Sequence, residues 1–255
     1  DMDDFTSRSG ALAKEKGIAD VYVDFLLKIH KEVTKRGKTM MFWADIVHRH
    51  PELIPQLPKN MVALNWGYEA KHPFEKECAE MKASGIPFYV CPGASSWLTI
   101  CGRTDNMMAC IDNAVTAGRK HGAMGLMMAD WGDHGHCQPF LVSLPAIVYA
   151  AAKWRGEKMA DRADLARAID RLVGAQVGEC LLRWGNLYRL CGRERGNSSE
   201  LFYMLANGAK YQRPAAVTDA NLAKVFQEVK AARAQRVLCG APEWVRDDMD
   251  LLDLL

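Results

Sequence analysis

The amino-acid sequence predicts an α/β fold: a run of parallel βα units, about half of a barrel, followed by a region of helices. Three observations predict it. Short apolar runs alternate with helical patterns at a spacing of ~25–35 residues, which is typical of parallel βα units. Only four such runs are found, all before residue 130. From residue 160 onward, only helical patterns follow.

Each element is predicted from its own pattern. The four apolar runs are expected to be buried strands, at residues 39–43, 61–66, 86–91 and 123–129. Apolar residues at helical spacing, ended in three cases by Gly37, Gly85 and Gly122, predict the helices. These helices are 21–35, 73–84, 105–121, 141–154, 162–173, 177–191, 199–207 and 219–238. Residues 48–58 are expected to form turns, and 247–255 a tail or a short docking helix.

The organisation that follows has two regions, a partial (β/α) barrel over residues 1–154 and an α-helical extension over 155–255. A complete eight-stranded barrel typically needs ~250 residues, and this chain shows four strands. Half a barrel has two open sheet edges, which must be covered or paired. Symmetric pairing of two copies would bury both edges, so a homodimer through the barrel edges is one expected partner.

The composition excludes several classes of protein. The chain has 33 basic and 31 acidic residues, a net charge of +2, which argues against a nucleic-acid binder that works through a basic field. Its apolar runs end well before the ~20 residues of a membrane helix, so no membrane partner is expected. The eight cysteines are scattered without a C-x-x-C pair, which favours reduced thiols and a reducing compartment such as the cytoplasm. No nucleotide motif is present, and no cofactor is expected.

Aromatic residues stand at the carboxyl end of every predicted strand, where parallel βα units carry their functional residues. Most of them have a carboxylate close by. Aromatic rings stack on the apolar faces of sugars and carboxylates accept hydrogen bonds from sugar hydroxyls, so this composition predicts a carbohydrate site. Core packing of single rings is the alternative. The residues are Trp43, Asp45, Trp66, Tyr89, Trp97, Trp131 and Asp133.

Histidine pairs offer a weaker alternative. His48-x-His50 and His134-x-His136, the latter next to Cys137, contain zinc-ligand residue types. An i, i+2 spacing in a loop is not a specific metal signature, so we expect no metal. A metal-dependent hydrolase that uses His134 and His136 stays open as a further reading.

Five segments at the strand ends together carry a resemblance to a known family. Three of them are Thr39-Met-Met-Phe-Trp43-Ala-Asp45-Ile46, Ala63-Leu-Asn-Trp66-Gly-Tyr-Glu69 and Pro87-Phe-Tyr89-Val-Cys-Pro-Gly93 with Ser96-Trp97. The two most specific segments are Gly102-Arg-Thr-Asp-Asn106 and Asp130-Trp-Gly-Asp-His-Gly-His136. Over roughly residues 8–154, the chain thereby resembles bacterial family-20 glycoside hydrolases, the β-N-acetylhexosaminidases.

The resemblance implies a (β/α)8 barrel whose strands 5 to 8 are the four strands of this chain. It implies substrate-assisted retention, in which the 2-acetamido oxygen of a terminal β-linked N-acetylhexosamine attacks the anomeric carbon. Tyr89 is then expected to bind the acetamido group, and Asp133, with Asp45, to bind sugar hydroxyls. Trp43, Trp66 and Trp131 become pocket walls. The expected partner is an N-acetylhexosamine-containing glycan.

One departure concerns the acid. The family places an Asp-Glu pair at the end of barrel strand 4: the Glu protonates the leaving oxygen and the Asp orients the acetamido group. Strands 1 to 4 are not recognisable in this chain, and the nearest equivalent of the pair is Asp3-Asp4. A solvated chain terminus is the alternative reading of these two residues. A non-catalytic sugar-binding or edge-paired assembly module is therefore the alternative function.

Overall fold

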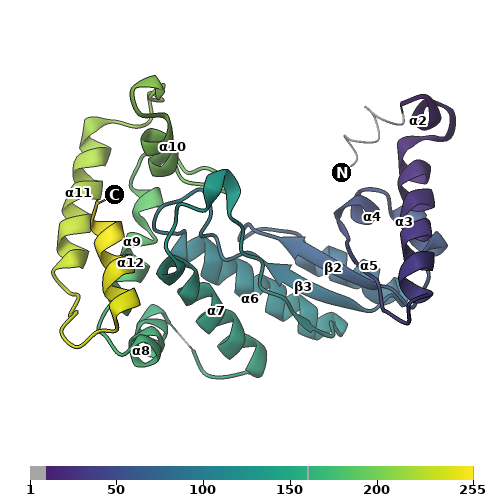
Figure 1. Cartoon of the computed structure of the whole chain (residues 1–255), viewed down its shortest axis with the longest axis horizontal. Helices are drawn as coiled ribbons and strands as arrows, with labels where there is room; N and C mark the ends of the chain where they lie inside the picture. Colours follow the sequence, from purple (N-terminus) through teal and green to yellow (C-terminus); the bar gives the residue numbers. More distant parts are fainter. Residues whose placement is uncertain (1–9, 160, 255) are drawn as a thin grey trace. The chain divides into compact units, whose positions relative to one another are not determined.

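The computed structural model describes residues 10–159 and 161–254 (Figure 1). The chain forms two compact units. Within the described residues, the first consists of 10–66, 73–91 and 114–127. The second consists of 67–72, 92–113, 128–159 and 161–254. The boundary expected near residue 154 stays a prediction. The second compact unit joins three segments from before that residue to the helices that follow it.

The elements follow one another in the order that the sequence predicts, strand and helix first and helices afterwards. The strands are β1 (Met41–Trp43), β2 (Val62–Gly67), β3 (Phe88–Pro92) and β4 (Gly125–Leu126). The α-helices up to β4 are α2 (Gly10–Lys16), α3 (Ile18–Thr34), α4 (Asp45–Arg49), α5 (Phe74–Ser84) and α6 (Thr104–His121). Those after it are α7 (Phe140–Arg155), α8 (Arg162–Val173), α9 (Gly178–Trp184), α10 (Glu200–Asn207), α11 (Asp219–Arg233) and α12 (Glu243–Leu254). Short 3-10 turns are η1 (Pro51–Gln56), η2 (Asp133–Gly135), η3 (Leu187–Arg189) and η4 (Gly208–Lys210).

The sheet has four strands in the order β1-β2-β3-β4, and β2 and β3 lie side by side in Figure 1. β1 pairs with β2 in parallel, with Phe42 opposite Ala63, and β3 pairs with β4 in parallel, with Tyr89 opposite Gly125. The predicted α/β class with parallel βα units is thus confirmed. The four strands are compatible with part of a barrel and form an open sheet.

The fourth strand is shorter than predicted. The ladder between β3 and β4 stops at Leu126 and resumes as an isolated bridge between Gly93 and Ala129. The reason is Pro92, which has no backbone N–H to donate to the neighbouring strand. Beyond it, the pairing continues through Ala129 N to Pro92 O (3.0 Å) and Ala94 N to Ala129 O (2.8 Å).

Most predicted helices are confirmed to within a few residues, because their end signals are the ones that the chain uses. Gly85 and Gly174 end α5 and α8 in the left-handed conformation, with φ of 71° and 68°. Asp161 and Ser199 cap the starts of α8 and α10 by accepting backbone N–H groups. Thr218 begins α11 with a reciprocal capping box, although α11 ends five residues earlier than predicted, at Arg233.

The prediction of one helix over 177–191 is wrong. α9 ends at Trp184, and a short 3-10 turn follows after Gly185 and Asn186. These two residues instead satisfy the start of α6: Gly185 O accepts the N–H of Thr104 at 2.7 Å, and Asn186 Oδ1 accepts that of Asp105 at 3.0 Å. A helix continued through this point would remove both acceptors from the four N–H groups that every helix start leaves unpaired.

Two further segments differ from expectation. Residues 48–58, predicted to be turns, include the end of α4 and the whole of η1, which begins at Pro51. The C-terminal segment is a docking helix, α12, which begins earlier than predicted. It buries Val245 and Met249, and Asp248 Oδ2 accepts the N–H of Leu141 at 2.8 Å in the first turn of α7.

Each unit has its own apolar core. In the first unit, Phe42, Val90 and Val115 are buried, as are apolar residues of α3 and α5. Gly118 brings α6 against Val90. In the second, α7, α8 and α9 bury Leu141, Leu165, Ile169 and Leu182. Among the described residues, no helix is both long and apolar enough to cross a membrane.

Candidate functional site

Loops from the carboxyl ends of three strands belong to the second unit. Residues 68–72 follow β2, residues 93–103 lie between β3 and α6, and residues 128–139 lie between β4 and α7. Parallel sheets carry their functional groups at this end of their strands, because the loops there are free to vary while the strands hold them together. We therefore build the candidate site from these loops.

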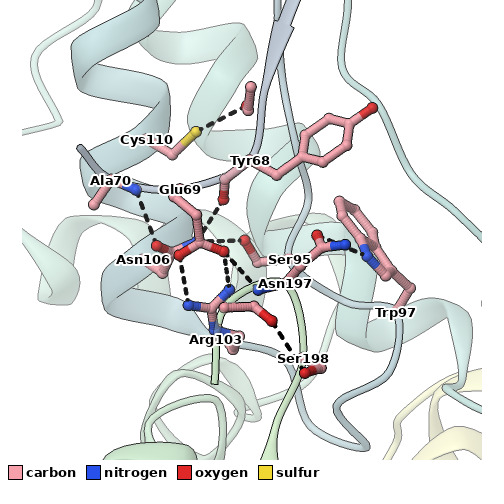
Figure 2. Close-up of polar contacts among 12 residues, drawn as sticks. Tyr68, Glu69, Ala70, Ser95, Trp97, Arg103, Asn106, Cys110, Asn197 and Ser198 are labelled. Atoms are coloured by element: carbon pink, nitrogen blue, oxygen red, sulfur yellow. Dashed lines mark hydrogen bonds and ion pairs between the residues drawn. The ribbon is translucent and has the colours of Figure 1, made fainter. Parts of the chain in front are cut away.

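An ion pair ties the first two loops together. Arg103 donates from Nη1 and Nη2 to the two oxygens of Glu69, both at 2.8 Å (Figure 2). The Arg103 side chain is 5% exposed and the Glu69 side chain 43% exposed. Burial by itself raises the pKa of Glu69, but the hydrogen bonds and positive charge of Arg103 outweigh it and hold that pKa below the usual range. The planar guanidinium also lies over the Tyr188 ring, 5.2 Å from its centroid.

Asn106 lies in the first turn of α6, three residues after Arg103. The oxygen and the nitrogen of its side-chain amide both form hydrogen bonds with the same loops. Its Oδ1 accepts the N–H of Ala70 at 3.0 Å, and its Nδ2 donates to Tyr68 O at 2.7 Å and to Ser95 Oγ at 3.0 Å (Figure 2). Buried polar groups that are fully paired in this way rigidify the backbone around them. Asn106 therefore fixes the loop after β2 against the loop after β3.

Trp97 is in a different setting from the one expected of a substrate-stacking residue. It is 2% exposed, its indole N–H donates to Asn197 Oδ1 at 3.1 Å, and its ring meets Tyr68 edge-on with centroids 5.0 Å apart. Gly93 makes this approach possible, because a Cβ there would lie 2.6 Å from the Trp97 ring and 2.7 Å from that of Tyr68. In the described structure, the contacts of Trp97 are those of a packed, oriented side chain.

Among the aromatic site residues predicted in this unit, Trp131 is the more exposed to solvent. Trp131 is 40% exposed, yet both its side chain and its backbone are hydrogen-bonded. Its indole N–H donates to the Tyr68 hydroxyl at 2.9 Å, and its carbonyl accepts from Gln138 Nε2 at 3.0 Å. Asp133, two residues further on, is exposed at the start of η2. An exposed aromatic ring with a fixed orientation, close in the chain to a solvent-facing carboxylate, suits recognition of a partly apolar, hydroxylated ligand.

Backbone strain accumulates in the same loops. After β3, Ser95, Leu98 and Ile100 have φ of 55°, 54° and 90°, and after β4 His134 and His136 have φ of 56° and 54°. The left-handed region is costly for non-glycine residues and most of all for a β-branched one such as Ile100. Such residues concentrate at functional sites, where the surrounding structure forces them.

The other predicted site residues belong to the first unit. Two of them are brought together: Trp66 Nε1 donates to Asp45 Oδ1 at 3.3 Å, while Asp45 also pairs with Arg49 at 3.2 Å. Trp43 is an exposed residue of β1. Tyr89 is half-buried on β3, and its ring covers Gly125 of β4, where a Cβ would lie 2.6 Å from the ring.

Asp3 and Asp4, the proposed acid pair, lie outside the described residues. Sequence reasoning missed the roles of Glu69, Arg103 and Asn106. The segment Gly102-Arg-Thr-Asp-Asn106 stands out in the sequence only by its resemblance, and nothing in its spacing shows which residues its side chains bind.

No group of three or more His, Cys, Asp or Glu side chains that could hold a metal ion is found within residues 10–159 and 161–254. His134 and His136 are both exposed in the loop after β4. Comparison with known proteins assigns no family: no protein-family model and no curated protein matches the sequence.

Proposed function

We propose that this chain is a family-20-type glycoside hydrolase, built on the C-terminal half of a (β/α)8 barrel, that removes terminal β-linked N-acetylhexosamine. The observation that carries the proposal is Trp131, among the loops that follow β2, β3 and β4: its exposed ring is bonded to Tyr68, and its backbone carbonyl is bonded to Gln138. Rigid aromatic surfaces lose little conformational entropy when a sugar ring stacks on them. The resemblance of the strand ends to the β-N-acetylhexosaminidases supplies the substrate class.

The proposed reaction uses the sugar's own acetamido group. Its carbonyl oxygen attacks the anomeric carbon while the glycosidic bond breaks, and an acid donates a proton to the leaving oxygen. Water then opens the oxazolinium intermediate and returns a proton to the acid. In the second unit, Trp131 contacts the sugar ring and Asp133 binds hydroxyls. The roles that the resemblance implies for Tyr89, Trp43, Trp66 and Asp45, which belong to the first unit, stay predictions. We assign the acid role to Asp4, beside Asp3.

The first test is binding of N-acetylglucosamine to wild type and Trp131→Ala, measured by isothermal titration calorimetry. Loss of one stacking ring is expected to weaken binding by about tenfold or more. Trp244→Ala is the matched control, because Trp244 is 43% exposed on α12 in the same unit and packs with Phe140. Equal affinities for Trp131→Ala and wild type, or no binding by wild type, would contradict the proposal.

The second test is turnover of an aryl β-N-acetylglucosaminide, with Asp4→Asn as the comparison. Turnover that is lost in Asp4→Asn supports Asp4 as the acid. Sugar binding without turnover in wild type would favour the alternative function, a non-catalytic sugar-binding module. The observation that keeps this alternative in view is the open four-stranded sheet, in which β1 and β4 are edge strands.

A further inference from the structure

The loop after β3 is bonded at three points to a loop of the C-terminal helical region. Trp97 donates its indole N–H to Asn197 Oδ1 at 3.1 Å. Ser199 donates its backbone N–H to Leu98 O and its hydroxyl to Thr99 O, both at 2.8 Å. The bonded stretch includes Leu98, one of the strained residues, so the helical region holds the strained loop in its conformation.

Asn197 itself is held in an uncommon conformation. Its φ is +57°, which asparagine tolerates better than most residues. Its backbone N–H donates to Glu69 Oε1 at 2.6 Å, and Glu69 is in turn fixed by Arg103 (Figure 2). Asn197 is exposed, yet both its backbone and its side chain form hydrogen bonds with residues of the candidate site. Its side-chain oxygen is thereby aimed at Trp97 rather than at solvent.

The contacts continue from Trp97 to the exposed aromatic ring. The Trp97 ring meets Tyr68 edge-on, with an angle of 78° between the ring planes. The hydroxyl of Tyr68 accepts the indole N–H of Trp131 at 2.9 Å. Asn197, Trp97, Tyr68 and Trp131 thus form one continuous chain of contacts, and all four residues belong to the second unit.

We propose that Asn197 is a positioning residue: it fixes Trp97, and through Trp97 and Tyr68 it sets the orientation of the Trp131 ring. The C-terminal helical region then contributes to the binding site, because it contains the residue that orients Trp131. What Trp131 recognises rests on the proposed function, but the positioning can be tested without any sugar. The test uses the indole N–H signals in ¹⁵N NMR spectra of the full chain, assigned with Trp97→Phe and Trp131→Phe.

The main variant is Asn197→Gly. Glycine adopts φ of +57° without strain and keeps the backbone N–H that binds Glu69, so only the side-chain acceptor is lost. We expect the Trp97 indole N–H to exchange with solvent about tenfold faster, as loss of one hydrogen bond implies. We also expect the Trp131 indole signal to shift, and N-acetylglucosamine to bind several-fold more weakly.

Two further variants separate positioning from general loosening of the loop. Asn197→Asp keeps an acceptor oxygen, so we expect both indole signals to stay as they are in wild type, in contrast to Asn197→Gly. Ser198→Ala is the matched control on the neighbouring residue: it removes the bond from Ser198 Oγ to Gly196 O (3.1 Å) without touching Trp97, so both signals should stay at their wild-type positions. If Asn197→Gly does not fold, Trp97→Phe removes the donor of the same bond and should shift the Trp131 signal.

The outcomes test the positioning role of Asn197 and the proposed function separately. If the Trp97 indole N–H exchanges with solvent at the wild-type rate in Asn197→Gly, the positioning role is overturned, whether or not the affinity for N-acetylglucosamine changes. A Trp131 signal that stays in place while Trp97 changes also overturns it, because the influence of Asn197 then ends at Trp97. If wild type binds no N-acetylglucosamine but the indole signals respond as expected, the proposed function fails and the positioning role stands.

Discussion

Glu69 shows how one side chain joins parts of the chain that lie far apart in sequence. It binds Arg103, 34 residues away, and the backbone N–H of Asn197, 128 residues away. The carboxylate accepts three hydrogen bonds from these partners, and this is why its pKa lies below the usual range although burial opposes the charge. Asp105 repeats the pattern: burial opposes its charge, but Asn186, Arg189 and Arg162 lower its pKa.

The residue-scale prediction follows from the sign of the Glu69 shift. A carboxyl whose pKa is lower in the folded chain stabilises the fold above its unfolded pKa, ~4.3, and loses that contribution as the pH falls through its folded pKa. We expect Glu69→Gln to lower the free energy of unfolding by about 1 kcal/mol at pH 7, because the carboxylate is half exposed. The difference from wild type should vanish in strong acid.

The measurement is urea unfolding of both chains between pH 7 and pH 3. Glu157→Gln is the control, since Glu157 is an exposed carboxylate whose pKa is also lowered, by Arg155 two residues away. Exposed pairs of this kind contribute little, so its unfolding should match wild type throughout. A Glu69→Gln difference that is equally large at pH 3 would show that the charge is not what Glu69 contributes.

At the scale of elements, α8 and α9 meet where a glycine leaves room for backbone. A Cβ on Gly178 would lie 2.3 Å from the carbonyl oxygen of Ala166 and 2.7 Å from its Cα. Neither atom can move without shifting α8. Gly178 also begins α9 with its N–H bonded to Asp170 Oδ1 at 2.7 Å. The close approach of the two helices therefore depends on this one position.

We expect Gly178→Ala to destabilise the fold by about 1–3 kcal/mol, the usual cost of overpacking a fitted interface. Thermal unfolding followed by circular dichroism measures it. Gly10→Ala is the comparison: among the described residues, no atom lies within 4 Å of a Cβ at Gly10 on α2, so alanine there should be neutral or slightly stabilising. A Gly178→Ala chain as stable as wild type would mean that α8 and α9 separate easily.

At the scale of the whole molecule, the open sheet raises the question of pairing between copies. Its edge strands are short: β1 has three residues and β4 has two. Short edges are one way in which proteins avoid edge-to-edge association, because few backbone groups are offered to another strand. We expect light scattering on a sizing column to give the mass of one chain at micromolar concentration. The mass of two chains would instead support the edge-paired homodimer.

Much of the fold could be predicted because its signals are local. The predicted bounds of helix α8 agree with the structure to the residue, since an apolar stripe, an Asp at its start and a Gly at its end lie within one stretch of chain. The short β4 could not be, because its length is decided by Pro92 on the strand opposite. Likewise, the break after α9 serves the start of α6, a helix about 80 residues earlier in the chain.

The α/β class, the parallel βα order, the helical C-terminal region and the strand ends at which chemistry is expected all follow from the sequence alone. These depend on periodicity, stop signals and residue type, which are read within a single segment. The folded structure was needed to show that Trp97 is buried, that the exposed Trp131 is bonded to Tyr68, and that Glu69, Arg103 and Asn197 join three loops. Hydrogen bonds between distant loops leave no local pattern, because they depend on where the folded backbone carries each side chain.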